Sequence, residues 1–318
     1  MQSPSVLILA QPDDVHALAV AECVRELGGR ADIFDSALFP ASSRASLSLE
    51  NGSQALFEIE QRSLDVSSRS TYDSVWLRRP RPHTVSPQYQ SDVRGFAQSS
   101  SRVLLFGGIF ATARVVINPP TANAGANYKP FQVALAARCG LKIPHTLVTN
   151  DPEDARRFVQ RLDRSIYKVA ATWRFDLKET RVVNKSDLQA LDGIADCPVI
   201  FQELIEGRAD IRATVVGNRI FAAEVDLGDM PPEQVDGRFR SRNLRECTLP
   251  ESVQSSLLRF HREAGLIYGA YDFRVDRDGE YVFLEVNPEG QYLFVEIETE
   301  QKISFEIARV LCSPPPLG

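Results

Sequence analysis

The hydrophobic pattern of the first third of the chain alternates between strand-like and helix-like segments. Residues 6–10 form a continuous apolar run, which is typical of a buried strand. Residues 17–27 repeat apolar side chains at helical spacing, and residues 31–34 and 74–77 return to a strand pattern. This order predicts an α/β lobe. No GxGxxG turn follows the first strand, which argues against a dinucleotide pocket.

The clearest pattern lies near the C-terminus, in residues 272–287. Apolar and polar residues alternate along the first segment, an acidic turn that contains glycine follows at 276–279, and a second segment ends in Glu-Val-Asn, so we expect a β-hairpin. Alternation places Glu285 and Asn287 on one face of the second strand and brings Asp272 near them on the first. Two carboxylates and an amide oxygen suit Mg²⁺. The alternative is a solvated strand face, but the run 282–284 is too apolar for an exposed strand, which favours the metal site.

A boundary between lobes is predicted at Asn118-Pro119-Pro120, because two prolines impose an extended linker. The elements expected after it are a helix from Tyr128 to Cys139, a helix from about Asp151, strands at 165–170, 180–183 and 198–202, and helices over 251–265 and 302–311. At 318 residues the chain is long enough for two or three lobes, and this boundary ends the first of them at residue 118.

Composition is that of an ordinary globular enzyme. The chain has 318 residues, 43% of them hydrophobic and 25% charged, which is enough for a large core. A formal net charge of −6 and a pI near 5.4 argue against nucleic acid as a partner. Five cysteines without CxxC spacing exclude a zinc knuckle and suit a reducing cytosol. The apolar run at 6–10 is too short for a signal peptide or a membrane span, so we expect a cytoplasmic protein that binds no membrane.

Several segments after residue 118 occur in the order found in ATP-grasp carboxylate–amine ligases, and this part of the chain resembles that family. The segments are Asn127-Tyr128-Lys129, residues 140–146, 167–168, 201–212 and 240–243, and the hairpin. Val75-Trp76-Leu77-Arg78-Arg79-Pro80 and Asp272-Phe273-Arg274 look most like the microviridin-type peptide-crosslinking ligases, the graspetide synthetases. The resemblance implies an α/β (α+β) ATP-grasp fold. Residues 1–118 would be a Rossmann-like pre-ATP-grasp lobe, 119–202 the lid lobe, and 203–318 the lobe with the metal site.

The resemblance also implies ATP and Mg²⁺, with two ions expected, as cofactors. Asp272, Glu285 and Asn287 would hold the metal. The residues expected at the nucleotide are Lys129 and Lys168 at the phosphates, Gln202, Glu203, Leu204 and Ile205 at adenine, Asp210 at the ribose, and Arg240 and Asn243. Ordinary alternatives exist, since the lysines can be solvated surface residues, Asp210 can pair with Arg212, and Asn243 can shape a turn.

Three arginines are candidates for catalysis: Arg79, Arg212 and Arg274. The implied reaction transfers the γ-phosphate of ATP to a carboxylate, and a hydroxyl or amine then attacks the acyl phosphate. Fixed guanidinium groups can stabilise the negative charge that develops. An ion pair with Glu285 is the main alternative for Arg274. Arg78 and Arg79 follow a buried strand, where they can hold a peptide carboxylate or belong to a surface turn.

One segment departs from the family pattern. The phosphate-covering loop of ATP-grasp enzymes is rich in glycine, but residues 170–180 contain none, so backbone cradling of phosphate is in doubt. Trp173 and Phe175 lie there among charged residues, which suits a peptide interface. We expect the lobe containing residues 173–181 to dock a leader segment.

Three hypotheses remain for the function. The first is an ATP-dependent macrocyclase that activates Asp or Glu side chains of a ribosomal precursor peptide, with a leader and a core rich in Thr, Asp and Glu. It would form ω-esters with Thr or Ser, or ω-amides with Lys. The second is a ligase that adds a free amino acid to a peptide, protein or small acid, and the third is a silent nucleotide-binding scaffold. The resemblance further implies a homodimer.

Overall fold

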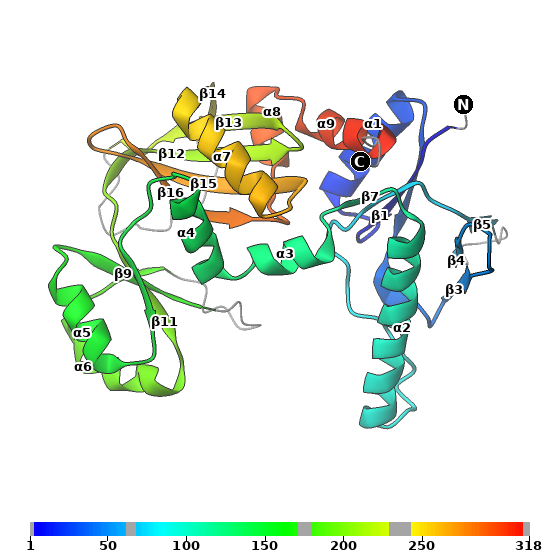
Figure 1. Cartoon of the computed structure of the whole chain (residues 1–318), viewed down its shortest axis with the longest axis horizontal. Helices are drawn as coiled ribbons and strands as arrows, with labels where there is room; N and C mark the ends of the chain where they lie inside the picture. The colour runs from blue at the N-terminus through cyan, green and yellow to red at the C-terminus, as the bar shows by residue number, and fades with distance from the viewer. Residues whose placement is uncertain (1–2, 62–67, 171–179, 229–242, 314–318) are drawn as a thin grey trace.

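The computed structural model describes residues 3–61, 68–170, 180–228 and 243–313 (Figure 1). Its N-terminal lobe is built on a parallel sheet with the strand order β2-β1-β6-β7. The strands are β1 (Ser5–Leu9), β2 (Arg30–Phe34), β6 (Ser74–Trp76) and β7 (Val115–Ile117). Side chains of β1 belong alternately to two hydrophobic clusters, one on each face of the sheet, which explains its continuous apolar run.

Helices cover both faces of this sheet. α1 (Val15–Glu26) packs on one face and α2 (Ser91–Thr112) on the other. A short 3-10 helix, η1 (Ser36–Leu38), precedes a small antiparallel sheet beside α2, made of β3 (Ser43–Ser48), β4 (Leu56–Gln61) and β5 (Ser68–Ser70). The lower half of α2 extends away from the sheet (Figure 1).

The central lobe is an antiparallel sheet with the order β10-β9-β11-β8. Its elements are β8 (Thr146–Thr149), α5 (Pro152–Gln160), β9 (Ser165–Val169), β10 (Arg181–Val182), α6 (Lys185–Gln189), η2 (Leu191–Asp196) and β11 (Val199–Glu203). Ala155, Leu191, Ile194 and Phe201 form its small core. The helix expected from about Asp151 is confirmed, with the Asp151 side chain accepting from the first-turn amides.

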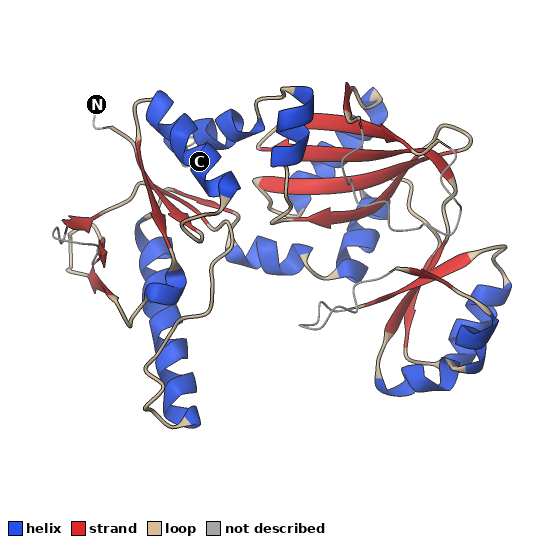
Figure 2. Ribbon diagram, turned by 180° about the vertical axis from the view of Figure 1, so that it is seen from behind, coloured by secondary structure: helices blue, strands red, loops and turns tan. Residues whose placement is uncertain are grey.

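The C-terminal lobe is an antiparallel sheet with the order β14-β13-β12-β15-β16 (Figure 2). Its strands are β12 (Gly207–Val216), β13 (Arg219–Asp226), β14 (Arg245–Cys247), β15 (Tyr268–Asp276) and β16 (Tyr281–Asn287). α4 (Lys129–Arg138) and α7 (Glu251–Glu263) cover one face. α8 (Leu293–Thr299) and α9 (Ile303–Cys312) lie over part of the other face, and α9 also packs on α1 of the N-terminal lobe.

The expected α/β fold class and the 272–287 hairpin are confirmed. α3 (Pro120–Ala126) follows the predicted boundary and leads into α4. The sequence grouped α4 with the central lobe, but in the structure α4 shares the hydrophobic core of the C-terminal sheet. Within the described residues, every helix is too short or too polar to cross a membrane.

Candidate active site

One face of the C-terminal sheet changes from apolar to charged along its length. On β15, Tyr268 packs against the helices that join this lobe to the N-terminal lobe, and Ala270 is also buried. Asp272 and Arg274 continue the same alternation. On β12, Thr214 is followed in the same way by Arg212 and Asp210. Side chains two residues apart lie on one face of a strand, so the charged residues share the uncovered part of this face.

A β-bulge in β16 brings Glu285 opposite Asp272. The register pairs Asp272 with Glu285 but Phe273 with Phe283, so Leu284 is the extra residue. Phe283 and Val286 consequently both lie in the core, although they are three residues apart, while Leu284 and Glu285 both line the pocket on the other side. The bulge therefore directs Glu285 out of an otherwise buried strand.

Cross-strand ion pairs connect β12 and β15. Arg212 Nε lies 2.9 Å from Asp272 Oδ1. Arg274 donates to both carboxylate oxygens of Asp210, at 2.8 and 3.0 Å, and to the carbonyl of Ile205 at 3.2 Å. Asp210 thus pairs with Arg274 rather than with Arg212, and Arg274 does not pair with Glu285 as the alternative had it. A ribose hydroxyl at Asp210 would have to share the oxygens that bind Arg274.

The two facing carboxyls have opposite pKa shifts. Burial and the neighbouring Glu285 together raise the pKa of Asp272 to about 7, against the charge of Arg212. Burial also opposes ionisation of Glu285, but the ammonium groups of Lys129 and Lys168 outweigh it and hold the pKa of Glu285 below its ordinary value. Two carboxyl groups that face each other across a strand pair, beside the amide of Asn287, form a hard oxygen set that fits Mg²⁺.

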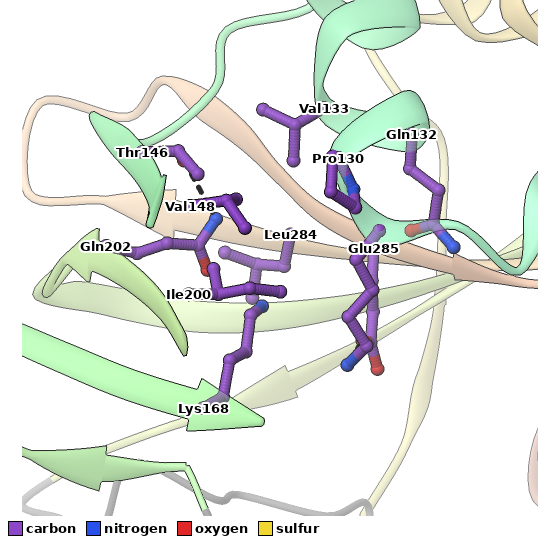
Figure 3. Close-up of a pocket in the computed structure, with 11 residues that line it drawn as sticks. Pro130, Gln132, Val133, Thr146, Val148, Lys168, Ile200, Gln202, Leu284 and Glu285 are labelled. Carbon is purple, nitrogen blue, oxygen red and sulfur yellow. Dashed lines mark hydrogen bonds and ion pairs between the residues drawn. The ribbon is translucent and has the colours of Figure 1, made fainter. Parts of the chain in front are cut away.

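A pocket with about 250 Å³ of empty space, partly open to solvent, lies between the central lobe, α4 and β16 (Figure 3). Lys129, Lys168 and Glu285 lie on its polar side, where Lys129 Nζ is 3.2 Å from Glu285 Oε2. Burial and the charge of Lys129 lower the pKa of Lys168 to about 8. Gln202 also lines the pocket and donates from Nε2 to Thr146 Oγ1 at 2.9 Å.

The pocket has an apolar wall that the sequence analysis did not identify. It is formed by Val133, Val148, Ile200 and Leu284. Alternation on a strand could have identified Ile200, because it stands two residues before the nominated Gln202. The other three come from elements whose approach depends on the packing of the lobes, so no local pattern marks them.

Other nominated residues lie elsewhere or are already engaged. The main-chain N–H groups of Glu203 and Leu204, expected at adenine, donate to the carbonyls of His145 and Arg164, at 2.9 and 3.1 Å. Neither donor is open to a base in this conformation. Asn243 is exposed next to β14, at the opposite edge of the sheet from β16. Arg240 and residues 171–179, including Trp173 and Phe175, lie outside the described residues.

Arg78 and Arg79, expected to act as a pair, have different environments. Arg79 is exposed, and its main-chain N–H donates to the carbonyl of Leu9. Arg78 is only 2% exposed and donates to the main chain after β16. Only Arg79 therefore remains accessible to a substrate carboxylate.

The chain matches no family model and no curated protein. It does match solved structures over nearly its whole length. The macrocyclase MdnC from Microcystis aeruginosa MRC, bound with the precursor peptide MdnA, is 27% identical at a TM-score of 0.84, with 98% of this chain and 99% of that chain covered. An ATP-grasp ligase associated with ribosomally synthesised peptides, from Chryseobacterium gregarium, in complex with ADP and a leader and core peptide, is 26% identical at a TM-score of 0.86, with 98% of both chains covered. The ATP-grasp ligase PsnB, complexed with a phosphomimetic variant of its minimal precursor, Mg and ADP, is 26% identical at a TM-score of 0.76, with 98% of both chains covered.

A pocket between two antiparallel sheets, with two lysines facing an acidic hairpin, is the arrangement of an ATP-grasp ligase, and the whole-length matches place this chain in that class. Within the class, the matches to peptide macrocyclases support a ligase of the graspetide type, the group to which the sequence pointed.

Proposed function

We propose that this protein uses ATP and Mg²⁺ to crosslink a ribosomal precursor peptide that has a leader and a core. The observation that carries the proposal is the convergence of Lys129, Lys168 and Glu285 on one pocket, with Asp272 facing Glu285. The similarity to macrocyclases bound to precursor peptides, over 98% of the chain, supports a peptide as the substrate.

Different residues of the pocket would bind the phosphates, the base and the metal. Lys129 and Lys168 offer ammonium groups to the phosphates. The apolar wall formed by Val133, Val148, Ile200 and Leu284 suits the flat base. Asp272, Glu285 and Asn287 would hold Mg²⁺, which when bound offsets the negative charge of the phosphoryl groups.

The proposed reaction has two steps. An oxygen of a core Asp or Glu carboxylate attacks the γ-phosphorus, the bond to the bridging oxygen breaks, and ADP leaves. A Thr or Ser hydroxyl, or a Lys amine, then attacks the acyl carbon and loses its proton while phosphate departs. Arg79, exposed at the end of β6, would hold the peptide carboxylate, and Arg212 and Arg274 would face the developing charge from β12 and β15.

The test is mass spectrometry of the enzyme with ATP, Mg²⁺ and the short peptide encoded beside its gene. Each ring should lower the peptide mass by one water, about 18 Da, with ADP and phosphate released in equal amounts. A mass gain that matches an added amino acid would favour the free-amino-acid ligase instead. No ATP consumption with any peptide or acid would favour a nucleotide-binding scaffold.

A cytoplasmic homodimer is also part of the proposal. All five cysteines are free thiols, which suits a reducing compartment. For self-association, α2 exposes Phe96, Val103 and Phe110 at intervals of seven residues, and these residues are 74%, 73% and 46% exposed. These residues lie opposite the helix face that buries Leu105 and Ile109. A seven-residue apolar repeat is typical of helices that pair.

For this pairing we propose the antiparallel register that sets Phe96 of one subunit opposite Gly107 of the other. A Cβ at Gly107 would meet no neighbouring atom within 4 Å, so the side chain of Gly107→Phe starts in open space on the exposed face of α2. It should make the protein monomeric in sedimentation analysis, and adding Phe96→Ala should restore the dimer. A wild-type monomer, or a dimer unaffected by Gly107→Phe, would contradict this interface.

A further inference from the structure

Arg78 is a buried arginine whose hydrogen bonds go to main-chain carbonyls, so it is not available to a substrate carboxylate. Its Nη1 donates to the carbonyl of Glu289 at 2.7 Å and, more weakly, to that of Gly290 at 3.5 Å. Its Nε lies 3.6 Å from Asp14, and its guanidinium lies over the ring of Trp76. A buried charge is costly unless it is paired or hydrogen-bonded, so these contacts give Arg78 its place in the fold.

Three successive carbonyls after β16 are held in this way by side chains from outside the segment. Asn118, 4% exposed, donates to the carbonyl of Pro288 at 2.9 Å, and its amide also binds the main chain of Tyr268. Arg78 holds the carbonyl of Glu289, and the Tyr268 hydroxyl donates to that of Gly290 at 2.8 Å. The segment Pro288–Gly290 is thus fixed by the residues that follow β6, by the inter-lobe linker and by β15.

This segment begins directly after Asn287, and Glu285 lies two residues further back. The Asn287 side chain accepts from the amide of Glu289 at 2.9 Å, so its orientation depends on the path of the segment. The fit is tight, because a Cβ at Gly290 would stand 2.4 Å from that of Ala270. A displaced segment would therefore displace the end of β16 as well.

We infer that Arg78 is a positioning residue, through which the N-terminal lobe holds Pro288–Gly290 and so sets Asn287 for the metal. The inference rests on the proposed role of Asn287 and extends it. It replaces the expectation that Arg78 joins Arg79 at a substrate carboxylate.

The experiment compares Arg78→Met, which removes the donors, with Arg78→Lys, which keeps one. The matched control is Arg81→Met, because Arg81 stands three residues away and pairs with Asp35 instead. Hydrogen exchange of the metal-free enzyme should show faster exchange at the amides of Glu289 and Gly290 in Arg78→Met, less change in Arg78→Lys and none in the control. Calorimetric titration with ADP should require about 10- to 100-fold more Mg²⁺ in Arg78→Met, the range seen when a group that orients a metal ligand is removed.

Two results would overturn the inference. Unchanged exchange and unchanged Mg²⁺ dependence, with a raised KM for the peptide, would make Arg78 a substrate ligand. Equally faster exchange throughout β12 and β15 would reduce its role to general stability. Asn287→Ala tests the proposed metal site separately from the inference. Wild-type Mg²⁺ dependence in that variant would remove Asn287 from the metal site. Hydrogen exchange in Arg78→Met would still show whether Arg78 holds the segment Pro288–Gly290.

Discussion

Changing Glu285 to Gln should separate the function of the acidic hairpin from its stability. The substitution keeps the size of the side chain and removes its charge. The contact that it weakens in the fold is the one with Lys129, where the two side chains are 39% and 34% exposed. Ion pairs at this exposure contribute about 0.2–1 kcal/mol, so the free energy of unfolding should change by less than about 1 kcal/mol.

The effect on activity should be much larger. A carboxylate that holds Mg²⁺ contributes, through the metal, several kcal/mol of charge stabilisation during phosphoryl transfer. At about 1.4 kcal/mol for each factor of ten, the rate of ATP turnover should fall by about 100- to 1000-fold. Added Mg²⁺ should recover part of the loss if the variant still binds the metal weakly.

The assay is ADP release as a function of Mg²⁺ concentration, with thermal unfolding of the same samples. Glu280→Gln is the matched control, because Glu280 is exposed on the same hairpin. It should retain wild-type turnover and stability. Wild-type turnover in Glu285→Gln at low Mg²⁺ would remove Glu285 from the metal site, and activity lost together with the fold would make its role structural.

Three further outcomes are expected. Lys129→Met and Lys168→Met should each weaken ATP binding in calorimetry. The loss of affinity should be smaller at high salt, because salt screens the attraction between the ammonium groups and the phosphates. Unchanged affinity in both variants would contradict the proposed nucleotide site. Gly107→Phe should halve the mass measured by light scattering while ATP binding is retained. A retained dimer would rule out pairing through the exposed face of α2. Burial lowers the pKa of His261 from 6.5 to about 4, so below pH 6.5 the unfolded chain binds a proton that the folded protein does not. As the pH falls from 6.5 to 4, His261 should therefore lower the free energy of unfolding by about 1.4 kcal/mol per pH unit. Urea unfolding of His261→Gln should show a weaker dependence of this free energy on pH than the wild type. Equal slopes in the two proteins would refute the lowered pKa.

The hairpin could be predicted because its signal is local. Alternation in the first strand, the apolar run 282–284 in the second, and an acidic turn with Gly279, which has φ of +87°, define both strands without reference to the rest of the chain. Alternation also placed Glu285 and Asn287 on one face. The bulge at Leu284, which sets Asp272 opposite Glu285, could not be read in this way, because a bulge shows only in the register of two paired strands.

The longest helix escaped prediction for the opposite reason. α2 contains Gly95, Gly107 and Gly108 and the run Ser99–Ser101, all of which are weak helix formers. Its stability comes from packing, since a Cβ at Gly108 would collide with the ring of Phe57. The burial of Arg78 could not be predicted either, because two arginines before a proline are typical of a surface turn. Arg78 is buried by its contact with the segment after β16, which is more than 200 residues away in the sequence.

The charged side chains of the active-site face compensate one another before any ligand binds. Arg212 with Asp272 and Arg274 with Asp210 largely neutralise each other within the sheet, so the charged end of the face can stay folded without metal or nucleotide. Among the described residues that line the pocket, Lys129 and Lys168 face one carboxylate, that of Glu285, so this lining carries a positive charge in a protein with a net charge of −6. The raised pKa of Asp272 reduces the negative charge further near pH 7. The empty pocket should therefore attract the phosphates of a nucleotide, and a divalent cation that arrives with them would draw Asp272 into its ionised form.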